Sequence, residues 1–256
     1  MVLSGKTALI TGSTSGIGLG IAEVLARNGA DVILNGFGDW QAAVAQLSCF
    51  GGRVGYNGAD LGDPAQIEAL FDYARREFGR VDILINNAGI QHVSPVECFP
   101  AERWDSVIAL NLTAVFHCTR LALPDMRAQD WGRVINIASV HGSVGSTGKA
   151  AYVAAKHGVL GLTKVVALET ALSGVTCNAV CPGWVLTPLV QQQIDARVAA
   201  GESPEKARAT LLAEKQPSQA FVTPQQLGEL TLFLCSSGAE QVRGAAWNID
   251  GGWLAQ

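Results

Sequence analysis

Residues 7–18 of the chain read TALITGSTSGIG, and this stretch decides the fold. A short run of apolar and β-favouring residues enters a glycine-rich turn, and a helical pattern begins near Gly16. Gly12 permits a tight turn, Gly16 lets the backbone approach a pyrophosphate, and Gly18 lets helix and strand pack closely. The backbone N–H groups at the start of such a helix face an anion. The stretch therefore predicts a dinucleotide cradle in the first strand–helix unit.

The rest of the chain alternates short apolar runs with longer helical patterns. Runs such as DILIN and RVINIAS lack a polar face, so helices should cover both faces of the sheet. The expected strands are residues 7–11, 31–35, 53–57, 82–86, 133–139, 175–180 and 245–249. The expected helices begin near Gly16, Asp39, Pro64, Ala101, Ala150 and Pro224. The pattern predicts an α/β fold: a single Rossmann-type, doubly wound domain over residues 1–256, with a seven-stranded parallel sheet flanked by helices.

One segment interrupts this alternation before the last helix and strand. Residues 187–220 are helical in composition but are broken by Gly201, Pro204 and Pro217. An insertion of this length serves either as a lid over a substrate or as a contact within an oligomer. We favour a small helical lid that closes over the substrate.

Composition and charge exclude several classes of function. The 256 residues are 48% hydrophobic and 16% charged, which suffices for a sizeable core. The net charge is −4 without a run of like charges, so nothing favours nucleic acid or an anionic membrane. Six scattered cysteines form no CxxC pair, and the histidines are sparse, so we expect reduced thiols and no metal site. Without a signal-peptide pattern or an apolar run of ~18 residues, the expected location is cytoplasmic.

A reacting group is predicted by Tyr152 and Lys156, whose spacing of four places them on one helix face. A phenol has an ordinary pKa of about 10, and one adjacent cation typically lowers a pKa by about one to three units. We expect Lys156, together with an oxidised nicotinamide, to make Tyr152 acidic enough to act as a base. Ser139 ends the preceding strand at the sheet edge where ligands bind, and its hydroxyl can hold a substrate oxygen. An ordinary exposed Tyr–Lys helix face is the alternative, and Ser139 and the glycine turn argue against it.

The choice of nucleotide is made after the second strand, where residues 35–39 read NGFGD. A 2′-phosphate would need Arg or Lys here or in the glycine turn, and neither place has one, which favours NAD over NADP. However, the acidic residue that should accept from the ribose hydroxyls is absent at the strand end. Asp39 lies nearby, and it could equally be the N-cap of the next helix.

Jointly these motifs resemble the short-chain dehydrogenase/reductase family over essentially the full chain. The matching residues are TGSTSGIG, Asp60, Asn86-Asn87-Ala88-Gly89, Asn111, Ser139, the YxxxK pair, and Pro182-Gly183 followed by Thr187. The resemblance implies that Tyr152 is the general acid/base, that Ser139 orients the carbonyl, and that Lys156 lowers the tyrosine pKa and binds the nicotinamide ribose. Asn111 would complete this catalytic set through a water link to Lys156.

The resemblance also implies contacts with the cofactor. Asp60 would meet the adenine and Asn87 the adenosine ribose region, while Ile17 and Thr187 would line the diphosphate and the carboxamide. The full expected cofactor set is Gly12, Thr14, Ser15, Gly16, Ile17, Gly18, Phe37, Asp60, Leu61, Asn87, Ala88, Gly89, Tyr152, Lys156, Pro182, Gly183, Val185 and Thr187. Members of the family are commonly homotetramers, and the apolar residues 245–254 could pack against a partner.

Residues beside the catalytic set indicate the substrate. His141 follows Ser139 by two residues and Lys149 precedes Tyr152 by three, so both can converge on the reacting centre. Two potentially cationic groups with two amides suit a short carboxylate. Taken singly, His141 could be a satisfied loop residue and Lys149 a solvated surface charge. The expected substrate-binding set is Gln91, Ser139, His141, Lys149, Tyr152, Trp184, Gln193 and Trp253.

The stretch SVHGSVGSTGKAAYVAAKHG resembles the 3-hydroxybutyrate dehydrogenases of this family. The resemblance implies reversible oxidation of (R)-3-hydroxybutyrate, a small hydroxy acid, to acetoacetate. A 3-oxoacyl-thioester reductase is an alternative, but it would favour NADPH and a basic surface. A polyol dehydrogenase would need acceptors for several hydroxyls, and a non-catalytic NAD-binding protein would not need Ser139, Tyr152 and Lys156 together.

Overall fold

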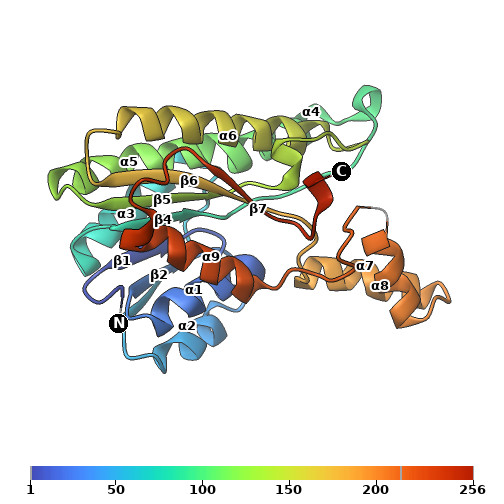
Figure 1. Ribbon diagram of the computed structural model, residues 1–256, viewed down its shortest axis with the longest axis horizontal. Helices are drawn as coiled ribbons and strands as arrows, with labels where there is room; N and C mark the ends of the chain where they lie inside the picture. Colours follow the sequence, from blue (N-terminus) through green and yellow to red (C-terminus); the bar gives the residue numbers. More distant parts are fainter. Residues whose placement is uncertain (1, 214, 256) are drawn as a thin grey trace.

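A computed structural model describes residues 2–213 and 215–255, with Leu189 described by its backbone alone. Its centre is a parallel sheet in the order β3-β2-β1-β4-β5-β6-β7 (Figure 1). The strands are β1 (Thr7–Ile10), β2 (Asp31–Asn35), β3 (Val54–Asn57), β4 (Ile83–Asn86), β5 (Gly132–Ile137), β6 (Val175–Pro182) and β7 (Ala246–Ile249). The order reverses between β1 and β4, and ligands bind at the carboxyl edge beside such a switch point. The predicted doubly wound domain with seven parallel strands is confirmed.

Helices cover both faces of the sheet. They are α1 (Gly16–Arg27), α2 (Trp40–Ser48), α3 (Pro64–Phe78), α4 (Ala101–Ile108), α5 (Ala114–Ala128), α6 (Ala150–Glu169), α7 (Pro188–Ala199), α8 (Pro204–Ala213) and α9 (Pro224–Cys235). One core joins α1, α2 and α9 to side chains such as Ile10 of β1, and the other joins α3, α5 and α6 to side chains such as Leu9. Neighbouring residues of a strand thus enter opposite cores, which explains why the strands carry no polar face.

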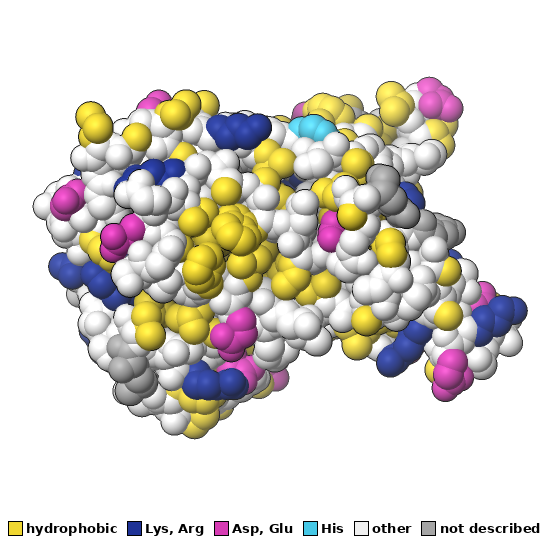
Figure 2. Space-filling view, in the orientation of Figure 1, with side chains coloured by type: hydrophobic (Ala, Val, Ile, Leu, Met, Phe, Trp, Pro, Cys, Tyr) yellow, Lys and Arg dark blue, Asp and Glu magenta, His cyan; other side chains and the backbone are white. Residues whose placement is uncertain are grey.

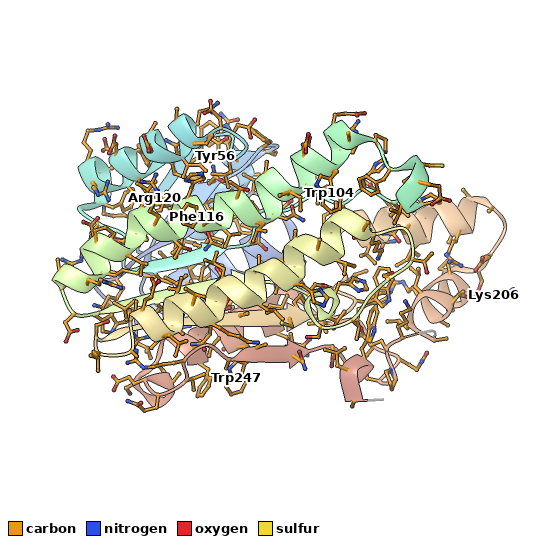
Figure 3. All side chains as sticks on the ribbon, turned by 90° about the horizontal axis from the view of Figure 1, so that it is seen from above. Tyr56, Trp104, Phe116, Arg120, Lys206 and Trp247 are labelled. Atoms are coloured by element: carbon orange, nitrogen blue, oxygen red, sulfur yellow. The ribbon has the colours of Figure 1, made fainter. Side chains whose placement is uncertain are left out.

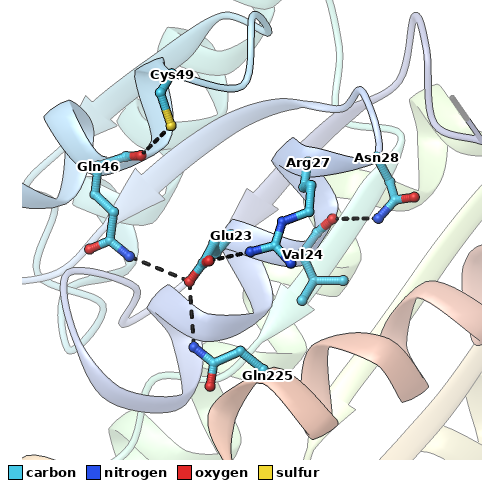
Figure 4. A network of polar contacts seen from close by, with 7 residues as sticks. All are labelled: Glu23, Val24, Arg27, Asn28, Gln46, Cys49 and Gln225. Atoms are coloured by element: carbon cyan, nitrogen blue, oxygen red, sulfur yellow. Dashed lines mark hydrogen bonds and ion pairs between the residues drawn. The ribbon is translucent and has the colours of Figure 1, made fainter.

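A polar cluster on the surface ties the three helices of the first core together (Figure 4). Glu23 of α1 accepts hydrogen bonds from Gln46 of α2 and Gln225 of α9, both at 3.4 Å, and forms an ion pair with Arg27. The close contact of α1 with α9 depends on glycine, because a Cβ at Gly20 would lie 2.3 Å from Cβ of Pro224. The helix that carries the cradle is therefore held from two sides.

The helical pattern that begins at Ala101 contains an interruption that was not predicted from the sequence. A π-helical turn (Ala109–Thr113) separates α4 from α5. Asn111 lies in this turn with its side chain fully buried, and it exchanges two hydrogen bonds of 2.9 Å with the backbone of Ile90. The turn thus binds the loop that follows β4, and π turns of this kind occur often at functional sites.

Two long helical stretches have the length and hydropathy of a membrane span. They are residues Ala101–Ala128 and Ala150–Glu169, with mean hydropathies of 1.4 and 1.2 over their most apolar windows. Both pack on the sheet, and buried side chains such as Cys118 of α5 and Val166 of α6 enter the second core. Core packing accounts for part of their apolar character, since 39% of each apolar window is buried.

The segment 187–220 forms the two helices α7 and α8, which project beyond the end of the sheet (Figure 1). They share a small apolar core of their own that includes Val190, Ile194 and Ala207. A parallel bridge between Val185 and Val222 joins the two ends of the segment. The segment 187–220 therefore leaves and rejoins the rest of the domain at one place, beside the carboxyl ends of the strands.

Candidate active site

The turn after β1 has a shape that only glycine can fill. Gly12 and Gly16 adopt φ angles of +60° and +56°, which L residues rarely adopt. A Cβ at Gly18 would lie 2.4 Å from the carbonyl oxygen of Gly12, and one at Gly12 would lie 2.9 Å from Cα of Ala88. Ser13 closes the turn by donating its hydroxyl to the carbonyl of Ile10 at 2.7 Å. The start of α1 is thereby left open towards the cavity, as a bound pyrophosphate requires.

The loop after β4 braces this turn. Asn87 donates its side-chain amide to the carbonyl oxygens of Thr11 and Gly12, at 2.9 and 2.8 Å. The hydroxyl of Thr11 in turn accepts from the backbone N–H groups of Asn87 and Ala88. Asn87, expected near the adenosine ribose, thus uses its amide nitrogen to fix the shape of the cradle.

A cavity of about 730 Å³ runs from the cradle past the end of β5 to the base of α7. It brings together most of the residues that the sequence singles out. Those that line it are Gly12, Thr14, Ser15, Ile17, Phe37, Asp60, Leu61, Asn87, Ala88, Gly89, Gln91, Ser139, His141, Lys149, Tyr152, Lys156, Pro182, Gly183, Trp184, Val185, Thr187, Gln193 and Trp253. Gly16, Gly18 and Asn111 lie outside the lining, where the first two shape the cradle and the third holds Ile90.

Helix α6 places Tyr152 and Lys156 one turn apart, as predicted. The Nζ atom of Lys156 lies 5.6 Å from the centre of the Tyr152 ring. The ammonium is buried and donates to the carbonyl of Ile137 at 2.7 Å, which ties it to the end of β5. Ser139 follows β5 by two residues and caps the short 3-10 turn Val140–Gly142. The three predicted catalytic side chains therefore share one wall of the cavity.

Burial shifts the pKa values of both Tyr152 and Lys156. Burial raises the pKa of Tyr152 above its ordinary value of 10, and a hydrogen bond with the side chain of Ser139 offsets only part of this rise. Burial also lowers the pKa of Lys156 to about 8, which the nearby Cys181 partly opposes. The expectation that Lys156 acidifies Tyr152 together with an oxidised nicotinamide concerns the enzyme with its cofactor bound, and it stays a prediction.

His141 and Lys149 converge on this centre, but only one of them is a cation. Burial, followed by the charges of Lys149 and Lys215, lowers the pKa of His141 to about 4. The imidazole is thus neutral near pH 7, which corrects the expectation of two cationic groups. Its ring packs edge to face on Tyr152, with 6.1 Å between centres, and its Nδ1 has no hydrogen-bond partner among residues 2–213 and 215–255. An unpaired buried nitrogen beside the phenol is suited to a substrate oxygen.

Two tryptophans form the far wall of the cavity. Trp184 and Trp253 lie side by side with 6.4 Å between ring centres, and His141 meets Trp253 edge to face at 5.5 Å. The Nζ atom of Lys149 lies 6.0 Å from the centre of the Trp184 ring. This end of the cavity therefore combines an apolar wall with a cation, while Gln91 and Gln193 add two amides to the lining.

The comparison with family models agrees with this geometry. A model described as short chain dehydrogenase matches residues 6–198. The chain belongs to this family. The resemblance drawn from the glycine turn, the Asn-Asn-Ala-Gly loop and the YxxxK pair is confirmed.

Named relatives of this short-chain dehydrogenase cover its whole length. A protein of Cupriavidus necator named D-beta-hydroxybutyrate dehydrogenase is 62% identical, with 100% of each chain covered. A protein of the same name from Rhizobium meliloti is 49% identical and covers 98% of this chain and 99% of its own. Among solved structures, L-sorbose reductase from Gluconobacter frateurii, complexed with NADPH and L-sorbose, has a TM-score of 0.95 at 31% identity, with 100% of both chains covered. Levodione reductase has a TM-score of 0.91 at 35% identity, with 99% of each chain covered.

The residues of this dehydrogenase fit a dinucleotide, which the family binds as nicotinamide cofactor. The glycine turn leaves room that any Cβ would fill, and the cavity continues from it to the phenol. At the end of β2, Asn35 is buried and donates its amide to the carbonyls of Asn57 and Ala59. Asp39 accepts from the N–H of Ala42 at 3.0 Å through one carboxylate oxygen, so it is the N-cap of α2.

Several lining residues were not predicted from the sequence. They are Asn35, Gly36, Ala59, Ile90, Val93, Leu110, Ile137, Ala138, Val140 and Val190. Most are apolar neighbours of predicted residues, and no residue type marks them in the sequence. Lys215 was also missed, although its charge acts on His141 and Lys149. Its distance along the chain from Tyr152 gave no signal, because only the return of the 187–220 segment brings it here.

The lowered pKa of His141 predicts a pH-dependent stability. Below the ordinary pKa of about 6.5 the unfolded chain binds a proton at this residue, whereas the folded chain does so only near its pKa of about 4. Stability should therefore fall as the pH falls through this window, by about 2 kcal/mol at pH 5 from this residue. Urea unfolding between about pH 7 and pH 5 should show a smaller loss in His141→Gln than in the wild type. The exposed His157→Gln variant should keep the wild-type dependence, and parallel curves for all three proteins would refute the assignment.

Proposed function

We propose that this protein interconverts (R)-3-hydroxybutyrate and acetoacetate, with NAD as the hydride acceptor. The observation that carries the proposal is a lysine without a counter-ion beside the phenol: no ion pair among residues 2–213 and 215–255 involves Lys149. Lys149 lies on the wall that also holds Tyr152 and His141. A cation so close to an alcohol-oxidising centre suits a substrate whose carboxylate is a few bonds from its hydroxyl. The names of the two bacterial relatives support the same substrate.

The protein's own groups handle the proton in this proposal. The backbone N–H of His141 donates to Oγ of Ser139 at 3.2 Å, and the serine hydroxyl is hydrogen-bonded to Tyr152, so a substrate oxygen bound here can contact both hydroxyls. Tyr152 is protonated in the protein alone, because burial raises its pKa, and is ready to donate to a ketone oxygen. In the oxidative direction Tyr152 first loses its own proton to solvent, the Lys156 ammonium stabilises the resulting phenolate, and the phenolate then accepts the hydroxyl proton of the substrate. The bound nicotinamide supplies the site that accepts or donates the hydride.

Asn111 acts as a positioning residue in this mechanism. Both ends of its side-chain amide are bound to the backbone of Ile90, so the side chain is not free to bind water. The π turn around it interrupts the regular hydrogen bonds of the helix and can leave a backbone carbonyl for a water link to Lys156. We propose that the expected water link uses this carbonyl.

The carboxylate is held beside the reacting centre, a few bonds from the substrate hydroxyl. Lys149 provides the charge, and His141, Gln91 and Gln193 provide neutral polar groups. When the carboxylate and the reacting oxygen are both fixed, only one face of the substrate carbon can point to the nicotinamide, which gives stereoselectivity. We propose that α7 and α8 act as a lid that closes over this part of the site and excludes water.

NAD is proposed over NADP because the adenosine end offers no cation for a 2′-phosphate. Residues 35–39 contain neither Lys nor Arg, and Phe37 is 70% exposed. The Thr14 hydroxyl is bound to the carbonyl of Phe37, so it is not free for a phosphate. The family alone does not decide the cofactor, since the L-sorbose reductase structure contains NADPH.

We propose that the enzyme is a cytoplasmic homotetramer. Apolar side chains remain exposed on the outer helices, including Phe116 of α5 (labelled in Figure 3) and Leu168 of α6, at 47% and 77% exposure. A second apolar patch lies over α9 and β7 (Figure 2), where Phe233 and Trp247 pack edge to face. Large apolar patches favour contacts between subunits. All six cysteines are free thiols, which suits a reducing compartment.

A panel of initial rates, followed by the absorbance of NADH or NADPH, tests the proposal. The highest kcat/KM should be found for (R)-3-hydroxybutyrate with NAD. The kcat/KM values for the (S) enantiomer, for a sugar alcohol and for the reaction with NADP should each be lower by about 100-fold. This is the discrimination that a buried polar site provides. A higher kcat/KM for a 3-oxoacyl thioester with NADPH would replace the proposal by the thioester reductase alternative.

A further inference from the structure

Lys215 lies on the segment that returns from α8, next to Trp253, which lines the substrate cavity. Its Nζ atom is 5.5 Å from the centre of the Trp253 ring. Trp253 neighbours Trp184, and Lys149 contacts the latter ring. Two lysines from distant parts of the chain therefore contact the two adjacent indole rings that form the far wall of the cavity.

The backbone beside Lys215 is fixed to this wall. Gln216 is 1% exposed, and its side-chain oxygen accepts from the backbone N–H of Trp184 at 2.8 Å. Its amide nitrogen donates to the carbonyl of Ala220, which closes the loop. Ser218 donates its backbone N–H to Gly251 at 3.0 Å, which joins the same loop to the segment that carries Trp253. Lys215 thus directly precedes a loop that is fixed to this wall by Gln216 and Ser218.

The charge of Lys215 reaches the carboxylate end of the site. It contributes, after burial, to the lowered pKa of both Lys149 and His141. No ion pair among the described residues involves Lys215. Asp250, the acidic residue of the C-terminal segment, accepts instead from the backbone N–H groups of Gly252 and Leu254. Two like charges in one wall are unfavourable together, and an anion between them relieves their repulsion.

We infer that Lys215 is a specificity-determining residue: together with Lys149 it attracts the substrate carboxylate into the cavity and selects acidic ketones over neutral ones. The inference rests on the proposed function. Lys215 does not act on the reacting oxygen, which lies on the Tyr152 side of His141. Its charge adds to the local potential at this wall, so its effect is on substrate capture and affinity.

The test compares acetoacetate with acetoacetamide, a neutral ketone of nearly the same size. In Lys215→Gln the KM for acetoacetate should rise by about fivefold, the effect of one partly screened charge, with kcat nearly unchanged. The KM for acetoacetamide should stay at its wild-type value. Raising the salt concentration from about 0.05 to about 0.5 M should reduce the difference in the KM for acetoacetate between variant and wild type.

Two control variants separate the charge at this position from other effects. Lys206→Gln removes a charge from the exposed outer surface of α8 (Figure 3) and should leave both KM values unchanged. Lys215→Arg keeps the charge and should retain a KM for acetoacetate near that of the wild type. The inference is overturned if Lys215→Gln raises the KM values of both ketones equally, or if Lys215→Arg raises the KM for acetoacetate as much as Lys215→Gln does. It is also overturned if Lys206→Gln raises the KM for acetoacetate by the same factor.

A third variant, Lys149→Met, distinguishes failure of the inference from failure of the proposed function. If Lys149→Met raises the KM for acetoacetate but Lys215→Gln does not, Lys215 has no role in specificity and the proposed function stands. If the wild type prefers acetoacetamide, or uses the two ketones equally, the carboxylate site does not exist. Both proposals then fail.

Discussion

Replacing Tyr152 by Phe should lower kcat for the proposed reaction by about 10²- to 10⁴-fold, the contribution typical of a general acid/base. The variant removes only the hydroxyl, so the ring can keep its packing on His141 and its position near Lys156. The affinity for NADH should therefore remain within a few fold of that of the wild type. The measurements are kcat with acetoacetate and the dissociation constant of NADH by fluorescence.

The chain offers a matched control for this variant. Tyr73 lies on α3 and packs on Phe78, outside the residues that line the cavity. Tyr73→Phe also removes one phenolic hydroxyl, and it should leave kcat unchanged. If Tyr152→Phe retained a tenth or more of the wild-type activity, on the order-of-magnitude scale of general acid catalysis, another group would have to move the proton.

Replacing Gly18 by Ala should abolish binding of the cofactor. The new Cβ would lie 2.4 Å from the carbonyl oxygen of Gly12 and 2.8 Å from Cα of Ser13, and both atoms belong to the turn itself. The turn must shift, at a cost of about 1–3 kcal/mol in stability and with loss of the shape that receives the pyrophosphate. NADH should raise the melting temperature of the wild type, because it binds only the folded state, and should raise that of the variant little or not at all.

Gly161→Ala provides the comparison. Gly161 lies on α6, and a Cβ there would meet no atom within 4 Å. The substitution should stabilise the protein by about 0.5–1 kcal/mol, since alanine is the better helix former, and should leave the response to NADH intact. A normal response to NADH in Gly18→Ala would show that the turn after β1 is not the cofactor cradle.

Most of the fold could be predicted because its signals are local. Strands such as β4 are buried on both faces, so they are apolar throughout and bounded by turns, and their order follows from the right-handed crossover of parallel strands. The π turn at Asn111 could not be predicted in this way. Its sequence has the same apolar pattern as the helices beside it, and its geometry is set by hydrogen bonds to Ile90, which lies on another element.

In the site, too, the features with local signals could be predicted and those that depend on the whole fold could not. The spacing of Tyr152 and Lys156 on one helix fixes their relation, so the sequence sufficed for the catalytic pair. The raised pKa of Tyr152 and the neutral state of His141 come from burial, which depends on the whole fold. Lys215 reaches the site only because the segment 187–220 returns beside Trp253. Charges brought together by tertiary structure leave no pattern in the sequence.

The central claim is that one cavity holds both ends of a short keto acid, with its ketone oxygen at Tyr152 and its carboxylate at Lys149. A crystal structure of the complex with NADH and acetoacetate tests this most directly. The claim predicts the ketone oxygen within hydrogen-bond distance of Tyr152 Oη and Ser139 Oγ, and the carboxylate against Lys149 Nζ. A carboxylate that points to solvent, or a ketone oxygen away from the phenol, would contradict it.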